Sequence, residues 1–178
     1  MGIFNSTIRI KQNLCIRCGK PCVWFSKKRC QQCAKVEDFY AKEAKILPED
    51  DGLPELIDRL DGLVSKYVRL NACDKDRNCE CYTCGDKRLW MTMDAGHYIA
   101  RSCMYLRFDM TRNIRPQCHI CNRSKYGMSP QFAAHLELEM PGSTEILLEE
   151  SRIIHKWSRE ELRAMIIEYT AKVKQLKL

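Results

Sequence analysis

Apolar residues recur at three- and four-residue spacing in two segments of the chain. The first segment follows a Pro- and Asp-rich breaker at residues 48–54, and its apolar positions are Leu56, Ile57, Leu60, Leu63, Val64, Tyr67, Val68 and Leu70. The second segment opens at Ser158, where Glu161 three positions later completes a capping box. Its apolar positions are Leu162, Met165, Ile166, Tyr169, Val173 and Leu176. Both segments therefore predict amphipathic helices.

The region between these helices has shorter, mixed patterns. Short strands are expected at residues 90–93, 98–100 and 113–115, separated by turn signals. Further helices are expected from Pro130 to Leu138 and from Thr144 to about Lys156, and an acidic helix at residues 34–47. Short strands flanked by helices predict a small α+β protein.

Composition narrows the class of protein. The chain has 178 residues, of which 45% are hydrophobic and 30% charged, enough for one ordinary domain or two to three small ones. No apolar run approaches the roughly 20 residues of a membrane helix. The first 11 residues lack the apolar core of a signal peptide. We therefore expect a cytoplasmic globular protein. The chain has 12 cysteines, and in a reducing cytosol such cysteines are expected to serve as metal ligands more often than to form disulfides.

The first cysteine set lies near the N-terminus. Cys15 and Cys18 form one C-x-x-C knuckle, and Cys30 and Cys33 form another after 11 intervening residues. Two knuckles supply four thiolates, the arrangement of structural Zn²⁺. Cys22 is an alternative to Cys18. So short a segment cannot build an apolar core, so the metal would supply most of its folding energy.

A second four-cysteine set occupies the middle of the chain. Its knuckles are Cys81 with Cys84 and Cys118 with Cys121, separated by 33 residues. They predict a second structural zinc site. The remaining cysteines are expected to be buried small apolar residues or spare thiols; they are Cys22, Cys73, Cys79 and Cys103.

The net charge of +7 is unevenly distributed. Residues 1–35, a predicted N-terminal zinc module, carry +8, and residues 36–78, a predicted helical linker region, carry −4. Residues 79–131, the predicted core, carry +4, and the C-terminal helical residues 132–178 carry −1. Positive charge thus coincides with the cysteine-rich segments, as expected for nucleic-acid binding, although small zinc modules are also basic for solubility.

The residues around the second cysteine set resemble a known family. In order, they are Asp94-Ala95-Gly96-His97-Tyr98, Leu106-Arg107-Phe108, Asn113-Ile114, Gln117-Cys118-x-x-Cys121-Asn122 and Lys125. This order resembles zinc-stapled, treble-clef HNH nucleases, and more closely the phage recombination family NinG, also called Rap. The resemblance covers roughly residues 69–177, including Trp157-Ser158-x-x-Glu161, and extends more loosely to the N-terminus.

The resemblance implies a ββα-metal core flanked by helices, in which a hairpin carries a base and a following helix carries metal ligands. His97 would be the general base, and a neutral imidazole suits that task. Asn122 would be one ligand of a catalytic Mg²⁺ or Mn²⁺ ion, and Asn113 would brace the intervening loop. The second zinc would fix the distance between hairpin and helix.

The acidic ligand of that ion is less directly indicated. Gly96 stands where many HNH sites have Asp or His. Asp94 lies three residues before His97, so a regular strand would place the two on opposite faces. A β-bulge at Ala95-Gly96 would bring them together, and we therefore expect Asp94 to be the ligand. Asp109 is a second candidate that more simply caps a turn.

Basic residues surround the predicted site. Arg101 is expected to stabilise the transition state. Phosphate contacts are expected from Arg107, Arg112, Arg115, Arg123 and Lys125. In the N-terminal module, Lys27, Lys28 and Arg29 either face DNA or form a solvated surface.

The resemblance implies a metal-dependent DNA endonuclease that cuts D-loops and Holliday junctions in the cytoplasm of a bacterial host, beside the host recombination machinery. One alternative is an inactive zinc-dependent DNA-binding accessory protein, which Gly96 favours. Another is a sequence-specific HNH nicking or restriction enzyme. Two symmetric incisions would suit a homodimer, and the two apolar helix stripes could pair between copies.

Overall fold

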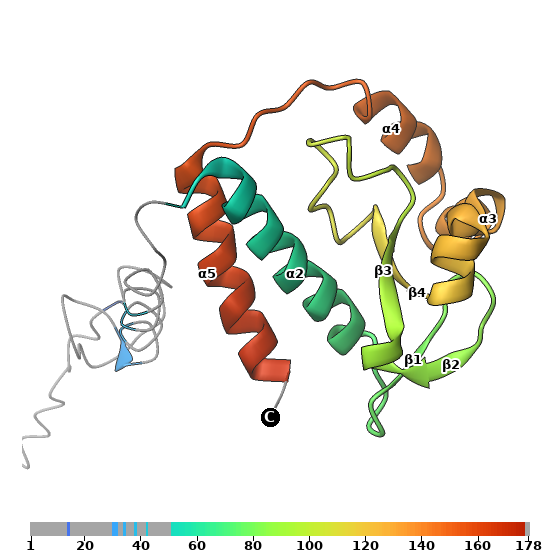
Figure 1. Cartoon of the computed structure of the whole chain (residues 1–178), viewed down its shortest axis with the longest axis horizontal. Helices are drawn as coiled ribbons and strands as arrows, with labels where there is room; N and C mark the ends of the chain where they lie inside the picture. Colours follow the sequence, from blue (N-terminus) through green and yellow to red (C-terminus); the bar gives the residue numbers. More distant parts are fainter. Residues whose placement is uncertain are drawn as a thin grey trace, which may run out of the picture. The chain divides into compact units, whose positions relative to one another are not determined.

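The computed structural model describes residues 51–176 and the isolated positions 14, 30, 31, 34, 38 and 42. The chain divides into two compact units, Met1–Pro48 and Glu49–Leu178. The elements of the second unit are α2 (Leu53–Asn71), β1 (Asn78–Glu80), β2 (Lys87–Leu89), η1 (Trp90–Thr92), β3 (Met93–His97), β4 (Ile114–Cys118), η2 (Ile120–Ser124), η3 (Tyr126–Met128), α3 (Ser129–Glu139), α4 (Ser143–Glu150) and α5 (Arg159–Leu176) (Figure 1). The described part is thus a small α+β structure.

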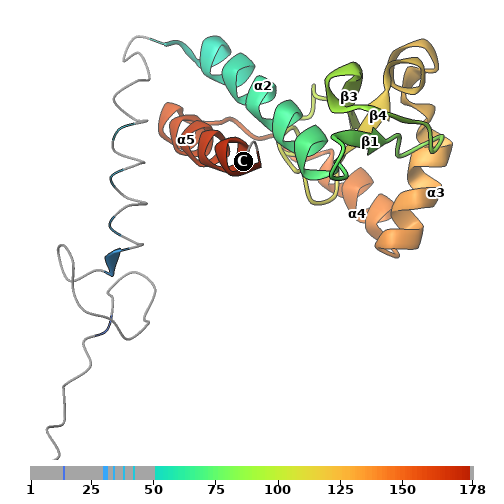
Figure 2. The ribbon, with the colours of Figure 1, turned by 90° about the horizontal axis from the view of Figure 1, so that it is seen from below.

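Helices α2 and α5 pack side by side (Figures 1 and 2). The predicted capping box starts α5, because the Ser158 N–H donates to Glu161 Oε2 at 2.8 Å and the Glu161 N–H donates to Ser158 Oγ at 3.2 Å. Tyr67 of α2 meets Tyr169 of α5 edge to face, with ring centroids 5.6 Å apart. The two predicted stripes therefore pack against each other within one chain.

Two small antiparallel sheets follow α2, one of β1 with β2 and one of β3 with β4. The strand predicted at residues 98–100 is wrong, because β3 ends at His97 and a bend follows. The strand predicted at residues 113–115 instead runs from Ile114 to Cys118, through Pro116. The Pro116 carbonyl accepts from the Tyr82 N–H at 2.8 Å, on the edge away from β3. The missing N–H of proline therefore costs the β3–β4 ladder nothing.

The C-terminal helices cover a separate apolar core. Leu106 from the loop after β3 is buried with Phe132 and Leu136 of α3 and Leu147 of α4. Helix α3 begins within one residue of its predicted start. Helix α4 stops at Glu150, earlier than predicted, and an extended strap follows to α5.

None of the helices in the described residues has the length and apolar character needed to cross a bilayer. The predicted helix at residues 34–47 and the N-terminal zinc module lie outside the described residues, apart from the isolated positions.

Candidate active site and metal centre

Four cysteines from two turns converge on one point. The Sγ atoms of Cys81, Cys84, Cys118 and Cys121 lie within 4.8 Å of one another. The first two come from the turn between β1 and β2, which Gly85 closes in the left-handed conformation at φ 74°. The other two end β4 and lie in η2. This cluster could hold a metal ion such as zinc, because four thiolates at this spacing are typical of structural Zn²⁺.

Hydrogen bonds favour the thiolate form of one of these cysteines. Burial raises the pKa of Cys81. Hydrogen bonds from the Thr83 hydroxyl and from backbone N–H groups have a larger, opposite effect, so the net pKa is lowered to about 6. The Cys118 N–H lies 3.2 Å from Cys81 Sγ, and the Cys121 N–H lies 3.5 Å from Cys118 Sγ. Donors aimed at sulfur stabilise the charged ligand that a metal ion needs. Of the first predicted set, only Cys30 lies among the described residues.

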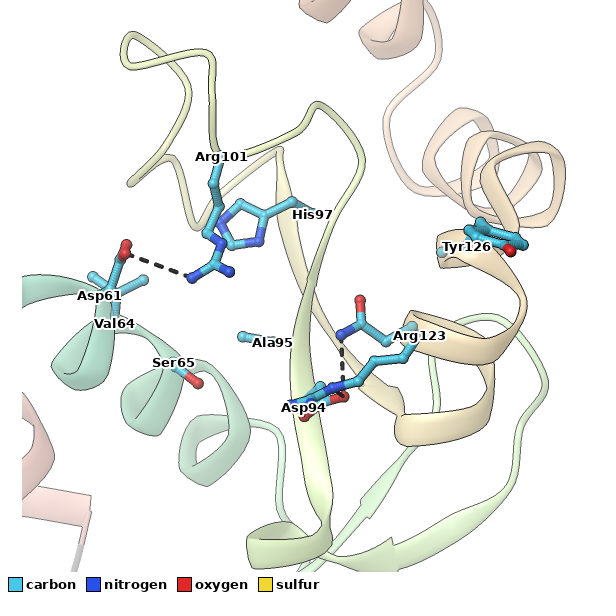
Figure 3. Close-up of a pocket in the computed structure, with 11 residues that line it drawn as sticks. Asp61, Val64, Ser65, Asp94, Ala95, His97, Arg101, Arg123 and Tyr126 are labelled. Carbon is cyan, nitrogen blue, oxygen red and sulfur yellow. Dashed lines mark hydrogen bonds and ion pairs between the residues drawn. The ribbon is translucent and has the colours of Figure 1, made fainter. Parts of the chain in front are cut away.

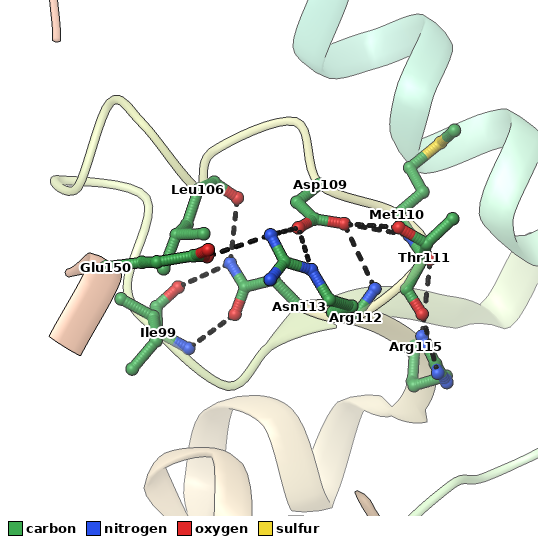
Figure 4. A network of polar contacts seen from close by, with 9 residues as sticks. All are labelled: Ile99, Leu106, Asp109, Met110, Thr111, Arg112, Asn113, Arg115 and Glu150. Carbon is green, nitrogen blue, oxygen red and sulfur yellow. Dashed lines mark hydrogen bonds and ion pairs between the residues drawn. The ribbon is translucent and has the colours of Figure 1, made fainter. Parts of the chain in front are cut away.

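The loop between β3 and β4 is held by one buried side chain. Asn113 Nδ2 donates to the carbonyls of Ile99 at 3.0 Å and Leu106 at 2.9 Å, and its Oδ1 accepts from the Ile99 N–H at 2.6 Å (Figure 4). Asn113 is fully buried. It therefore braces the loop and does not reach the cleft described below.

Asp109 caps the same loop and lies apart from the other predicted site residues. Its Oδ1 accepts from the backbone N–H groups of Thr111 and Arg112, each at 3.1 Å, and Arg112 also bridges Asp109 to Glu150 of α4 (Figure 4). Burial raises the pKa of Asp109, but these hydrogen bonds and the charge of Arg112 lower it more, so the net shift is downward. Its oxygens are thus occupied by the turn.

A polar cleft of about 320 Å³ lies between α2, β3 and η2 (Figure 3). It brings together four of the predicted catalytic residues, Asp94, His97, Arg101 and Asn122. Further lining comes from Asp61, Val64 and Ser65 of α2, and from Ala95, Arg123, Tyr126 and Gly127. The segment predicted to be a helical linker thus forms one wall of the cleft.

Asp94 is the most heavily bonded acid in the cleft. Its Oδ2 accepts from Arg123 Nε at 3.2 Å (Figure 3). It also accepts from Asn122 Nδ2 at 3.1 Å, and His119 Nδ1 lies 3.4 Å away. Burial raises the pKa of Asp94, but the Asn122 and Arg123 hydrogen bonds and the charges of Arg123 and His119 lower it more. The carboxylate is therefore ionised at neutral pH.

The predicted bulge between Asp94 and His97 is absent. The β3–β4 register is regular, with Asp94 opposite Gln117 and His97 opposite Ile114. The two side chains thus leave opposite faces of β3, and both still line the cleft. Within residues 51–176, β3 pairs with β4 on one edge only. The cleft extends around the other, unpaired edge of β3 and therefore contacts side chains from both of its faces.

His97 is largely buried and fixed through one ring nitrogen. Its Nε2 lies 3.1 Å from the carbonyl oxygen of Arg107. Burial lowers the pKa of His97, and the charge of Arg101 lowers it further. The carbonyls of Arg107 and Ala95 and the charge of Asp61 raise it, but the net shift is downward. The imidazole is therefore neutral at pH 7 and holds one proton.

Packing against the neighbouring strand requires glycine at position 96. A Cβ added there would lie 1.9 Å from Oε1 of Gln117, which is fully buried on the neighbouring strand. Gln117 Nε2 in turn donates to the Gly127 carbonyl at 2.9 Å and to Thr83 Oγ1 at 3.2 Å. The space that an acidic side chain would need at this position is thus filled by a glutamine amide that ties β4 to the turn after η2.

The predicted helix after the second knuckle is a single π-type turn. The Lys125 N–H donates to the Ile120 carbonyl at 2.9 Å, and Gly127 then breaks the helical path at φ 80°. Asn122 lies within this turn, together with Cys121 of the metal cluster. The position of Asn122 is therefore set by the cluster more than by a long helix.

The predicted basic residues divide into two groups. Arg101 and Arg123 line the cleft, with side chains 61% and 64% exposed, and Lys125 is exposed nearby. Three others are paired internally: Arg107 with Asp61, Arg112 with Asp109 and Glu150, and Arg115 with Glu139. The structure does not bring Arg112 and Arg115 to the cleft. Lys27, Lys28 and Arg29 lie outside the described residues.

Comparison with known proteins connects this site to one phage family. The family model described as "Bacteriophage Lambda NinG protein" matches residues 26–178. The chain belongs to the NinG family. NinG proteins of Salmonella phage P22, Escherichia phage 933W and Escherichia phage lambda are 35%, 34% and 33% identical over 118, 117 and 117 residues. Each match covers 64% of this chain.

The chain spans about half the length of these relatives, since the matches cover 54%, 54% and 53% of them. No solved structure matches the chain. The NinG match includes both the cysteine cluster and the cleft, so these features belong to the part of the chain that the family describes.

Three residues of this NinG chain's site were missed by sequence reasoning. Asp61 lies in α2, which the sequence indicated only through its apolar positions. Gln117 was noted only as part of a motif. Tyr126 is 92% exposed at the rim of the cleft, in the left-handed conformation at φ 50°. The Tyr-Gly pair at residues 126–127 is a turn signal that could have indicated this rim.

Proposed function

We propose that this NinG chain is a metal-dependent DNA endonuclease with an HNH-type ββα-metal site, acting on branched recombination intermediates. The observation that carries the proposal is the gathering of Asp94, His97, Arg101 and Asn122 in one cleft, next to a four-cysteine cluster. A neutral histidine, an ionised carboxylate and exposed arginines are the groups that phosphodiester hydrolysis requires.

His97 is the proposed general base. The Arg107 carbonyl can only accept, so we place the proton of the neutral ring on Nε2, which leaves a lone pair on Nδ1. Nδ1 then takes a proton from the attacking water. The lowered pKa of His97 keeps this nitrogen unprotonated at neutral pH.

Asp94 and Asn122 would hold a catalytic Mg²⁺ or Mn²⁺ ion. A carboxylate and an amide oxygen suit a hard cation that also binds the substrate phosphate. Such an ion, when bound, would supply positive charge to the leaving 3′ oxygen. Arg123 now neutralises Asp94, and its side chain is exposed enough to turn from this carboxylate to a phosphate group. Arg101 would bind the same phosphate from the other side of the cleft.

The cysteine cluster would set the distance between these groups. Cys118 pairs with Met93 at the start of β3, next to Asp94, and Cys121 lies beside Asn122. A zinc ion bound by both cysteines would hold the two ligand-bearing segments together. Its proposed role is structural.

The preference for branched DNA rests on the family resemblance, and Tyr126 supports it. This exposed aromatic ring stands at the cleft rim on three successive residues with positive φ, Tyr126, Gly127 and Met128. Exposed aromatic rings beside basic clefts stack on unpaired bases. A D-loop presents such bases in its displaced strand, whereas continuous duplex does not. Partners would be branched DNA and the host recombination machinery.

Cleavage of labelled duplex, flap, D-loop and four-way DNA, in Mg²⁺ or in EDTA, tests the proposal. We expect Mg²⁺-dependent cutting that is strongest on branched forms and is lost in His97→Ala. His155→Ala is the matched control, because His155 meets Trp157 edge to face outside the cleft. Tight binding with no cutting under any divalent ion would favour an accessory DNA-binding protein. Cuts at one duplex sequence would favour a nicking or restriction enzyme.

A further inference from the structure

We infer that Asp61 of helix α2 is a positioning residue that holds His97 in its base-competent tautomer. The inference rests on the proposed nuclease function. Asp61 lies in α2, which comes before all the motifs that predicted the active site.

Asp61 clamps the loop after β3 through one guanidinium group. Its Oδ1 accepts from Arg107 Nε at 3.1 Å, and its Oδ2 accepts from Arg107 Nη2 at 2.5 Å. The Asp61 and Arg107 side chains are only 15% and 16% exposed. A bidentate pair in this geometry fixes the orientation of both partners, and at this burial it is little screened by solvent.

The clamped residue is also the one that bonds His97. The carbonyl of Arg107 accepts from His97 Nε2 at 3.1 Å, so the same residue joins α2 by its side chain and the histidine by its backbone. Arg107 Nη1 further donates to the carbonyl of Arg101 at 3.0 Å. Asp61 thus determines where the loop places the acceptor that keeps the proton on Nε2.

Asp61 has a second contact inside the cleft. Arg101 Nη1 lies 3.6 Å from Asp61 Oδ2, and both residues line the cleft (Figure 3). The carboxylate therefore orients the exposed guanidinium proposed to bind phosphate. Helix α2 packs against β3, so the clamp and the histidine belong to contacting elements.

Loss of this clamp should affect the chemistry more than the binding of DNA. In Asp61→Ala, the Arg107 guanidinium loses its carboxylate partner, and the loop can move the Arg107 carbonyl away from His97 Nε2. Displacements of about 1 Å at a catalytic group can lower the rate about 100-fold. We expect kcat to fall by 10- to 100-fold and KM to change less than 3-fold.

The test reads the tautomer directly. Full-length protein labelled with ¹⁵N-histidine is studied by long-range ¹H–¹⁵N correlation at pH 7.5, and His97→Gln assigns the His97 signals. We expect the wild type to show a proton on Nε2 and none on Nδ1. Asp61→Ala should show averaged signals of both tautomers. Asp58→Ala is the matched control, because Asp58 is exposed on the preceding turn of α2.

Zinc content and thermal midpoint are measured in parallel, so that unfolding of Asp61→Ala is recognised. Asp61→Asn, which keeps the shape and loses the charge, is used if Asp61→Ala unfolds. A wild-type proton on Nδ1 overturns the inference. So does an unchanged His97 spectrum in the folded Asp61 variants. A wild type with the expected tautomer that cuts no DNA would instead overturn the proposed function, and with it the catalytic purpose of the clamp.

Discussion

Gly96 and Gln117 show how a single residue can depend on its neighbour across a sheet. Because the Gln117 amide occupies the space of a Cβ at Gly96, Gly96→Ala should destabilise the fold by about 1–3 kcal/mol, the usual cost of overpacking. The urea midpoint measures this change. In a Gln117→Ala background the same substitution should cost less than half as much, since the clash is gone.

Gly62 supplies the control for this prediction. It lies inside α2, and nothing is within 4 Å of a Cβ added there. Gly62→Ala should therefore stabilise the protein by about 0.5–1 kcal/mol, because alanine loses less conformational freedom in a helix. Equal effects of alanine at both positions would contradict the packing argument at Gly96.

The buried histidine gives a pH dependence of stability. Because the folded pKa of His97 lies below its unfolded value of about 6.5, the unfolded chain takes up a proton before the folded chain does. Stability should then fall as the pH is lowered from 7.5 through 6.5, until the folded pKa is passed. Asp94 has the same dependence in a lower pH range: its pKa is lowered from 3.8, so its contribution to stability is lost only at more acidic pH.

Urea titrations of wild type and His97→Gln between pH 5 and 7.5 isolate this effect. The variant should lack that part of the slope, while the other three histidines contribute equally to both proteins. Parallel pH profiles for the two proteins would show that His97 is not the group responsible.

The sequence indicated the polar groups of the cleft that could act in catalysis. The resemblance to HNH nucleases pointed to His97 and Asn122, and Asp94 was predicted because a carboxylate can be a hard-metal ligand. Asp61 could not be predicted, since its partner Arg107 is 46 residues away and only the packing of α2 on β3 brings them together. The predicted bulge was wrong because the spacing of two side chains says nothing about the shape of the cleft that receives them.

At the scale of elements, sequence signals predicted correctly those elements whose stabilising contacts lie between residues close in the sequence. The capping box located the start of α5, and three- and four-residue spacing located α2. The strands were less well placed, because the β3–β4 register depends on partners 17 to 25 residues apart, from His97 with Ile114 to Met93 with Cys118. A short apolar run does not contain that information.

The loop between β3 and β4 should depend on one side chain. Asn113→Ala removes three hydrogen bonds and leaves the backbone groups of Ile99 and Leu106 without this partner in a buried place. We expect a loss of roughly 2–3 kcal/mol and faster amide exchange over residues 98–112. Asn71→Ala, at the exposed end of α2, should change stability by less than about 0.5 kcal/mol. Unchanged exchange in the loop would refute the bracing role.

The cysteine cluster should act as a single unit. Cys84→Ser should lower the zinc content by one ion per chain and expose β1, β2 and η2 to proteolysis, because two short strands cannot form a stable sheet unaided. Cys103→Ser is the matched control, since Cys103 lies outside the cluster. Zinc content is read by a colorimetric chelator after unfolding. An unchanged zinc content in Cys84→Ser would exclude the cluster as a zinc site.

At the scale of the whole molecule, the helices with the two apolar stripes form an intramolecular pair, and one of them, α2, also lines the cleft. Helix α2 contacts both α5 and β3. Its apolar face therefore supports the fold, while Asp61 and Ser65 are directed to the cleft. The spacing of apolar residues predicts such a helix and its apolar face. It does not predict which elements pack against that face or against the polar one.

The distribution of charge leads to a final prediction, which rests on the proposed binding of DNA. Arg123 is exposed at the cleft, whereas Arg112 is held between Asp109 and Glu150. Each phosphate that a basic side chain neutralises adds about 0.9 to the slope of log K against log salt. Arg123→Gln should lower that slope by about 0.9, and Arg112→Gln should leave it unchanged. Fluorescence anisotropy with a four-way junction between 50 and 200 mM salt, in EDTA, measures both. Equal losses of slope in the two variants would mean that the internal ion pairs open when DNA binds. The cleft arginines would then contribute no more to phosphate binding than the internal ones.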